Sequence, residues 1–230
     1  MSACGRSRPL VACICLTADR PEMTLEAVAC YHAQTYPSPL RRLLIFDTSR
    51  ERPERRIGDW IGDETGCSEV TVFHWYESRW PADTIGSLRN RANSIADTLW
   101  HPDLLAHFDS DDLSASGRLE DQVARLESAQ GHGKSVTGYR SIIFTNGVKR
   151  WRYLGDPAFI CGTSLMYRTD WWREHRFPSI NICEDSEFAS EAWRAGRSIP
   201  ADGGEMITAR IHAGNTSRKE IASNWEELPA

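Results

Sequence analysis

Three carboxylates within four residues form the most chemically suggestive segment of the sequence. Asp109-Ser110-Asp111-Asp112 directly follows the apolar segment 104–108. Carboxylates this close repel one another unless a cation compensates. Oxygen-rich sites of this kind suit Mg²⁺ or Mn²⁺, which retain water and bridge substrate phosphates. The alternative is a solvated turn that caps the next helix, because Asp and Ser are good capping residues, and composition does not choose between the two.

Polar residues also follow two other apolar segments. Thr17-Ala-Asp-Arg20 comes after residues 10–16, and Asp47 comes after residues 43–46. Turn chemistry explains any one of these groups by itself. Ligands of open α/β sheets, however, bind at the carboxyl ends of the strands, so three polar strand ends on one edge favour a ligand site.

Two later groups have a functional and a structural interpretation. Glu184-Asp185 opens a predicted helix; acids favour that position through the helix dipole, and a carboxylate there could also serve as a general base. His212 lies in a loop rich in Gly, Asn, Thr and Ser. A lone His is usually structural or superficial, and the alternative is a metal ligand.

Arg89 and a group of aromatic residues complete the candidates. Arg89 lies off the apolar stripe of the predicted helix 85–99 and could hold a phosphate or a nucleobase edge by charge-assisted bonds. Otherwise it belongs to a solvated face. Aromatic side chains cluster in the second half, and we expect most in the core, with one or two able to stack on a sugar ring. They are Trp151, Tyr153, Phe159, Trp171 and Trp172.

The pattern of elements predicts an α/β fold with a mostly parallel central sheet and antiparallel additions. In the first half short apolar strands alternate with helical periodicity. The second half is less regular, and Asn146-Gly147 predicts a hairpin there. Expected strands cover 10–16, 43–46, 70–73, 104–108, 135–144, 148–154 and 206–211, and expected helices cover 21–34, 85–99, 118–130 and 184–196.

Composition places the chain among ordinary globular proteins. It has 230 residues, 40% of them hydrophobic, and a formal net charge of −5, which predicts one domain and lowers the odds of non-specific nucleic-acid binding. No apolar run approaches the ~20 residues of a membrane span, and no signal-peptide pattern is visible. Seven scattered Cys suggest no disulfide framework. We therefore expect a cytoplasmic protein.

Taken in order, these motifs resemble those of GT-A glycosyltransferases of family 2, an inverting class. The match covers residues 9 to 217. It is carried by the opening strand with T-A-D-R (11–20), A-Q-T-Y (33–36) with L-I-F-D-T-S (44–49), G-S-L-R-N-R-A (86–92), F-D-S-D-D (108–112), C-G-T-S-L-M-Y-R (161–168) with E-D (184–185), and H-A-G-N-T-S (212–217).

The resemblance implies a single GT-A domain over residues 1–230. Its donor half would cover about 9–113 and its acceptor half about 114–217, with a peripheral tail at 218–230. The implied reaction moves one sugar from a nucleotide-diphospho-sugar, UDP-linked in our reading, to an acceptor hydroxyl with inversion. A divalent metal, Mn²⁺ or Mg²⁺, would stabilise the leaving diphosphate.

The resemblance also implies roles for single residues. Thr17, Arg20 and Asp47 would hold the nucleotide base and ribose, and Arg89 would contact the base or phosphates. Asp109 would touch the ribose or donor sugar. The metal set would comprise Asp111, with Asp109 and His212. Asp185 would deprotonate the acceptor hydroxyl, and Glu184 would orient it.

Departures from the family pattern leave other functions open. Asp19 stands where the family has Asn, and Phe46 and Thr48 replace an Asp and a Gly beside Asp47. One alternative is a nucleotidyltransferase, although residues 17–20 lack its Gly-rich, basic first loop. Another is a catalytically inactive sugar- or nucleotide-binding domain. The acceptor stays open among glycan, lipid-linked sugar, protein, small molecule and, less readily given the charge, modified DNA.

Overall fold

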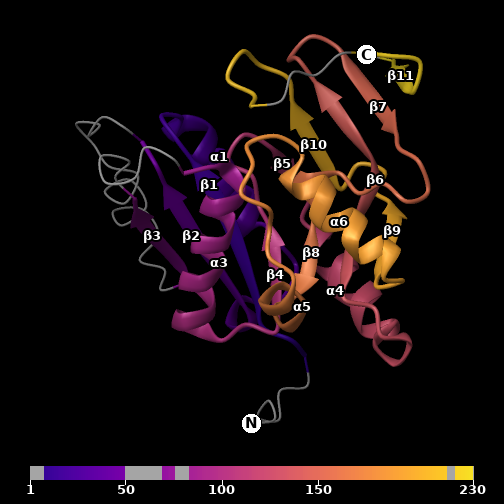
Figure 1. The fold of residues 1–230 in the computed structure, drawn as a ribbon. Helices are drawn as coiled ribbons and strands as arrows, with labels where there is room; N and C mark the ends of the chain where they lie inside the picture. The colour runs from indigo at the N-terminus through magenta and orange to yellow at the C-terminus, as the bar shows by residue number, and fades with distance from the viewer. Residues whose placement is uncertain (1–7, 50–68, 76–82, 217–220, 230) are drawn as a thin grey trace.

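A computed structural model describes residues 8–49, 69–75, 83–216 and 221–229. The first half alternates strand and helix (Figure 1). Its strands pair in parallel in the order β3-β2-β1-β4, which confirms the predicted parallel sheet. The elements are β1 (Val11–Thr17), α1 (Pro21–His32), η1 (Ser38–Leu40), β2 (Arg41–Asp47), β3 (Val70–His74), α3 (Ile85–Trp100) and β4 (Leu104–His107).

The second half extends the same sheet with antiparallel pairs, from β4 through β8, β6 and β7 to β11. Strands β9 and β10 run parallel to β6, and β5 pairs with β10. The elements are β5 (Leu113–Ser114), α4 (Arg118–Ser128), η3 (Gln130–His132), β6 (Val136–Thr145), β7 (Arg150–Leu154), η4 (Gly162–Ser164), β8 (Met166–Arg168), α5 (Thr169–Glu174), α6 (Glu184–Arg194), β9 (Ser198–Asp202), β10 (Ile207–Arg210) and β11 (Trp225–Leu228).

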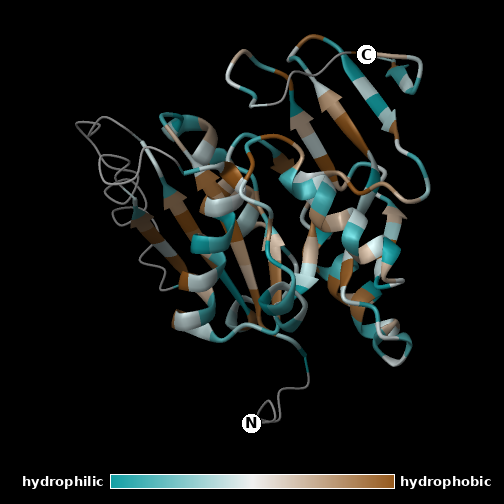
Figure 2. Ribbon diagram, in the orientation of Figure 1, coloured by the Kyte–Doolittle hydropathy of each residue, from teal (hydrophilic) through white to brown (hydrophobic). Residues whose placement is uncertain are grey.

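Helices cover both faces of the parallel strands, because alternate residues of a strand point to opposite sides. Cys13 and Cys15 pack in one buried cluster with residues of α1 and α4. Ala12 and Ile14 pack in a second cluster with residues of α3, α5 and α6. Figure 2 shows the central strands as the brown, hydrophobic part of the ribbon. The result is a three-layer core with the sheet in the middle.

The buried face of α3 differs from the expected one. The helix spans the predicted residues, but Leu99 of the apolar stripe is 52% exposed, whereas Arg89 and Asn93 are buried. Tertiary packing overrides the apolar periodicity here, because buried polar groups find partners across the interface. Arg89 is therefore not part of a solvated face.

The other expected elements are present with boundaries close to the expected ones, and the structure adds β5, β8, α5 and β9, which were not expected. The Asn146-Gly147 hairpin joins β6 and β7, with Gly147 at φ 86°. Strand β11, which was not among the expected strands, lies in the segment 218–230 and pairs with β7 at an edge of the sheet. The expected loop at 48–66 falls mostly outside the described residues.

Candidate active site

A cavity of about 670 Å³ lies where the loops after β1 and β4 meet the start of α6. The chain passes from β1 to β2 on one side and later returns to β4 on the other side of β1. Such a topological switch opens a crevice at the carboxyl ends of the strands. Most of the predicted site residues line it: Thr17, Arg20, Arg89, Asp109, Asp111, Glu184 and Asp185.

The loop after β1 bends sharply at Asp19. This residue has φ 52°, in the left-handed region that Asn and Asp tolerate better than other non-glycine residues. Its backbone N–H donates to Ser49 Oγ at 2.9 Å. The bend brings Arg20 back across the cavity, where one guanidinium nitrogen lies 2.5 Å from Asp111 Oδ2. Asp in place of the family's Asn is thus compatible with the local backbone.

Asp111 gathers partners from two distant parts of the chain. Besides Arg20, its Oδ2 lies 3.0 Å from His212 Nε2. A second nitrogen of the Arg20 guanidinium donates to the carbonyl of Gly214 at 3.2 Å. The backbone N–H of His212 donates to Asn215 Oδ1 at 2.7 Å. The loop after β10 is therefore folded against the loop after β1.

The side chains around Asp111 could hold a divalent metal only if a bound substrate supplied further oxygen atoms to it. Within the described part of the chain no group of three or more His, Cys, Asp or Glu side chains is placed to hold an ion. Asp111 and His212 form a pair, while Asp109 Oδ1 is directed toward Arg89, 3.5 Å away. Mg²⁺ usually takes one or two protein ligands and completes its shell with water and substrate phosphates. Asp111 supplies one such carboxylate, and His212 Nε2 lies 3.0 Å from it as a possible nitrogen ligand.

A buried Arg89 connects the β4 carboxylates with α6. Its Nε donates to Glu184 Oε1 at 3.0 Å, and its Nη1 lies 3.5 Å from Asp109 Oδ1. Burial raises the pKa of Glu184 despite the facing guanidinium. Burial opposes ionisation of Asp109 as well, but Arg89 leads the cations that outweigh it and hold the pKa of that carboxyl below its usual value. Arg89 contacts carboxylates here, a different set of partners from the base or phosphates implied by the resemblance.

Glycine makes the close approach of α3 to this region possible. A Cβ at Gly86 would lie 1.8 Å from the carbonyl oxygen of Pro178 and 3.3 Å from Glu184 Cβ. Any larger residue would push α3 away from the segment that leads into α6. Gly86, one of the motif residues, thus sets the distance over which Arg89 reaches Glu184.

Asp185 lies against the backbone of η4. A Cβ at Gly162 would lie 1.5 Å from Asp185 Oδ2, so a side chain there would occupy the space of the carboxylate. The Gly162 carbonyl faces His107 Nδ1 at 2.8 Å, and the Thr163 carbonyl accepts from the buried Arg118 at 2.9 Å. These hydrogen bonds hold η4 against the end of β4, so the backbone that Asp185 contacts is fixed in position.

Asp47, the last residue of β2, and Asp112, in the loop after β4, have different surroundings. Asp47 does not line the cavity: it is buried, with its Oδ1 accepting from Ser49 and its Oδ2 3.0 Å from His74 Nδ1. Asp112, to which sequence reasoning gave no separate role, does line it and accepts from the backbone N–H of Arg210 at 3.0 Å. Burial, with Asp109 and Asp111 nearby, raises the pKa of Asp112 to about 7.

Sequence reasoning also missed part of the cavity wall. Phe144 of β6 and Trp225 of β11 line it. Phe144 sits in an expected strand, and its place in the alternation of β6 could have suggested it. No sequence signal marks Trp225, because the strand that carries it was not predicted.

Comparison with known proteins finds similarity of structure only. No protein-family model matches the sequence, and no curated protein matches it. Among solved structures, TarS from S. aureus in complex with UDP-GlcNAc matches with a TM-score of 0.71 at 16% identity, over 92% of this chain and 62% of that chain. TarS in complex with UDP matches with a TM-score of 0.68 at 15% identity, over 88% and 60%.

A second solved protein gives the same result. The mannosyltransferase PcManGT from Pyrobaculum calidifontis, in complex with GDP-Man and Mn²⁺, matches with a TM-score of 0.62 at 15% identity, over 89% of this chain and 57% of that chain. The chain thus spans less than two thirds of the length of these proteins. It shares their Rossmann-like α/β fold, as the sequence predicted. None of the described helices has the length and apolar character needed to cross a membrane.

Proposed function

We propose that this chain is a glycosyltransferase that moves one sugar from a nucleotide-diphospho-sugar, UDP-linked in the first instance, to an acceptor hydroxyl. The observation that carries the proposal is the meeting of two sets of carboxylates at one cavity. Asp109 and Asp111 reach it from the end of β4, and Glu184 and Asp185 reach it from the start of α6. In the proposed reaction, the carboxylates of β4 would hold the cation that the anionic leaving group of the donor needs. The carboxylates of α6 would accept the proton that the acceptor must lose.

On the donor side, the main difficulty is the charge of the diphosphate. Among the described residues, the cavity is lined by five carboxylates, those of Asp109, Asp111, Asp112, Glu184 and Asp185, and by three guanidinium groups, those of Arg20, Arg89 and Arg210. Such a site accepts a diphosphate when a cation compensates. A Mg²⁺ or Mn²⁺ held by Asp111 and His212 would neutralise the charge that develops on the leaving diphosphate. Arg20 sits beside Asp111 and would share that carboxylate.

On the acceptor side, Asp185 is the candidate general base. It accepts hydrogen bonds from Ser186, whereas Glu184 is held by Arg89. In the proposed step the acceptor hydroxyl gives its proton to Asp185, its oxygen bonds to the anomeric carbon, and the bond from that carbon to the diphosphate breaks. A base on the face opposite the leaving group makes the product inverted, as in other two-sided carboxylate chemistry.

The fold supports this proposal through the ligands of the matched structures. TarS carries UDP or UDP-GlcNAc, and PcManGT carries GDP-Man with Mn²⁺. We assign the donor to the half formed by residues 9–113 and the acceptor to the half formed by residues 114–217. Strand β11, in the tail that follows, completes the lining of the cavity through Trp225. Thr17 and Arg20 remain our candidates for holding the nucleotide, together with Asp47 and Arg89 after local rearrangement.

Turnover of a donor panel tests the proposal. We expect one or more of UDP-glucose, UDP-galactose, UDP-GlcNAc and GDP-mannose to release its nucleoside diphosphate in the presence of Mn²⁺, and Asp111→Ala to abolish the release. Asp185→Asn should slow turnover while the protein still binds the nucleotide. Release of pyrophosphate from a nucleoside triphosphate would instead favour a nucleotidyltransferase. Nucleotide binding without any turnover would favour an inactive binding domain.

A further inference from the structure

Four aromatic side chains form one wall of the cavity, away from the carboxylates of β4. They are Phe144 of β6, Tyr153 of β7, Phe159 before η4, and Trp225 of β11, and all four line the cavity. The ring centroids of Phe144 and Trp225 lie 4.5 Å apart, those of Tyr153 and Trp225 5.5 Å, and those of Tyr153 and Phe159 5.3 Å. We call these four residues the aromatic wall.

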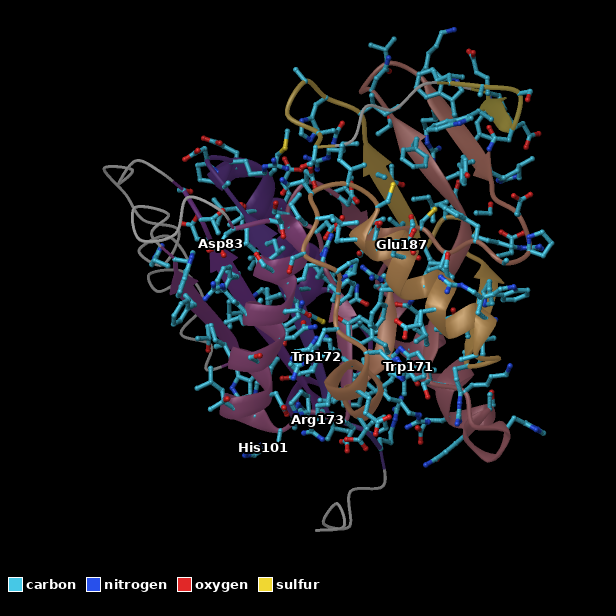
Figure 3. All side chains as sticks on the ribbon, viewed as in Figure 1. Asp83, His101, Trp171, Trp172, Arg173 and Glu187 are labelled. Atoms are coloured by element: carbon cyan, nitrogen blue, oxygen red, sulfur yellow. The ribbon has the colours of Figure 1, made fainter. Side chains whose placement is uncertain are left out.

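The aromatic wall is only partly covered by the protein. Phe144 is 6% exposed, while Tyr153, Phe159 and Trp225 are half-buried. The other aromatics that the sequence offered for sugar stacking are core residues: Trp151, Trp171 and Trp172 are buried. Figure 3 shows Trp171 and Trp172 on α5, near the lower part of the view and far from β11. Of the aromatic residues proposed from the sequence, those that are both half-buried and at the cavity are therefore Tyr153 and Phe159, and Trp225 joins them from β11.

Neutral polar side chains share the cavity with the wall. Asn181, Asn224 and Ser186 line it together with Asp185, and each can hydrogen-bond a hydroxyl group. Sugar rings present C–H faces that pack on aromatic rings and hydroxyl edges that need such partners. Pockets that combine apolar surface with a few polar groups orient small ligands in this way.

Among the described residues, the cations at the cavity are paired with carboxylates, which disfavours an anionic acceptor. Arg20 is paired with Asp111, and Arg89 with Glu184 and Asp109. Arg210, the third guanidinium at the cavity, is paired with Glu26. A nucleic acid gains most of its affinity from cations that neutralise its phosphates, and the three guanidinium groups that the described residues bring to the cavity are each paired with a carboxylate.

Given the glycosyltransferase function proposed above, on which this inference rests, we infer that the acceptor is a neutral saccharide. One of its rings stacks on the aromatic wall, with Trp225 as the main platform, and its hydroxyl edge faces Asn181, Asn224 and Asp185. The hydroxyl that enters the reaction loses its proton to Asp185. Strand β11 is then part of the acceptor site, because it carries Trp225 and pairs with β7.

The test measures how candidate acceptors accelerate donor turnover. Nucleoside diphosphate release from the active donor is followed with cellobiose, maltose, lactose and chitobiose, and in parallel with 4-nitrophenol, a single-stranded DNA oligonucleotide and a polyprenyl phosphate in micelles. We expect at least one disaccharide to accelerate release and to give a disaccharide product. Trp225→Ala should raise the KM for that disaccharide at least about tenfold, as loss of a central aromatic contact does.

Three variants separate a stacking role from a structural one. Trp225→Phe keeps a ring and should recover most of the affinity for the disaccharide. Phe159→Ala should also raise the KM for the disaccharide, and this variant replaces Trp225→Ala as the test if Trp225→Ala fails to fold. Trp193→Ala is the matched control, because Trp193 is 45% exposed on α6 and does not line the cavity; it should change neither the KM for the disaccharide nor donor turnover.

The outcomes distinguish this inference from the proposed function. Acceleration only by the phenol, the oligonucleotide or the polyprenyl phosphate overturns the saccharide assignment but keeps the glycosyltransferase. Turnover of the donor without acceleration by any saccharide, or an unchanged KM in both Trp225→Ala and Phe159→Ala, overturns it as well. A protein that neither binds nor turns over any nucleotide sugar defeats the proposed function itself.

Discussion

Replacing Gly162 by alanine should disable the candidate base without touching the donor site. The added Cβ would lie 1.5 Å from Asp185 Oδ2, 2.4 Å from its Cγ and 2.8 Å from its Cβ. The backbone of η4 cannot move away easily, because His107 and Arg118 hold the carbonyls of Gly162 and Thr163. The carboxylate must therefore move, and because the Cβ of Asp185 is also too close, the first turn of α6 must shift with it.

The size of the effect follows from these distances. Relieving a 1.5 Å approach to an ordinary contact of 3.4 Å displaces the Asp185 oxygen by about 1.9 Å. Because a misplacement of about 1 Å can cost about 100-fold in rate, we expect kcat for sugar transfer to fall by at least about 100-fold. Overpacking of this kind destabilises by about 1–3 kcal/mol, so Tm should fall moderately.

The assay compares Gly162→Ala with Gly131→Ala, where a Cβ would meet nothing within 4 Å. Nucleoside diphosphate release and Tm are measured for both, and for Gly162→Ala combined with Asp185→Ala. The combined variant should regain part of the lost stability, because the clashing Cγ and Oδ2 are gone, and its rate should be no lower than that of Asp185→Ala alone. Full activity in Gly162→Ala would refute the assignment of Asp185 as the base.

Three more predictions concern the surroundings of the site. The pKa of Asp112 is raised from 3.8 to about 7, so the folded state binds this proton more tightly than the unfolded state. The stability that the bound proton contributes is therefore lost as the pH rises from about 4 to 7. Asp112→Asn should flatten the pH dependence of Tm over that range in metal-free buffer. Arg118→Met should destabilise by about 3 kcal/mol or more, because it leaves the buried carbonyls of His107 and Thr163 without donors; urea unfolding would measure this, and a loss below about 1 kcal/mol would contradict it. Cys183→Gly should raise Tm slightly, because Cys183 has φ 68° at the start of α6 and a left-handed non-glycine residue costs about 1–2 kcal/mol; an unchanged or lower Tm would show that the backbone there is not strained.

The local part of the site could be predicted because it depends on strand ends. Apolar runs fix where β1 and β4 stop, so Thr17, Arg20 and the carboxylates Asp109 and Asp111 had to meet at one edge of a parallel sheet. The fold class followed from the same alternation of strands and helices. Neither inference needed contacts between distant residues.

The remainder depended on such distant contacts. Arg89 was expected off the buried face of α3, and its burial arises from Glu184, which lies 95 residues later. The position of Asp47 depends on His74, which holds its carboxylate away from the cavity wall. Trp225 belongs to an edge strand whose pairing with β7 no local periodicity announces. Residues that gain their role from a partner far along the chain stay hidden in a single sequence.

Nucleotide binding with and without metal tests the central claim most directly. Thermal unfolding is followed with UDP, GDP, CDP, dTDP and ADP, each with and without Mn²⁺, in the wild type and in Asp111→Ala. A ligand at about 100 times its Kd stabilises by about 2.7 kcal/mol, which is visible as a rise in Tm. We predict that one nucleoside diphosphate, UDP first, raises Tm only with Mn²⁺ and that Asp111→Ala removes the effect. An unchanged Tm across the whole panel would contradict the donor site at the ends of β1 and β4.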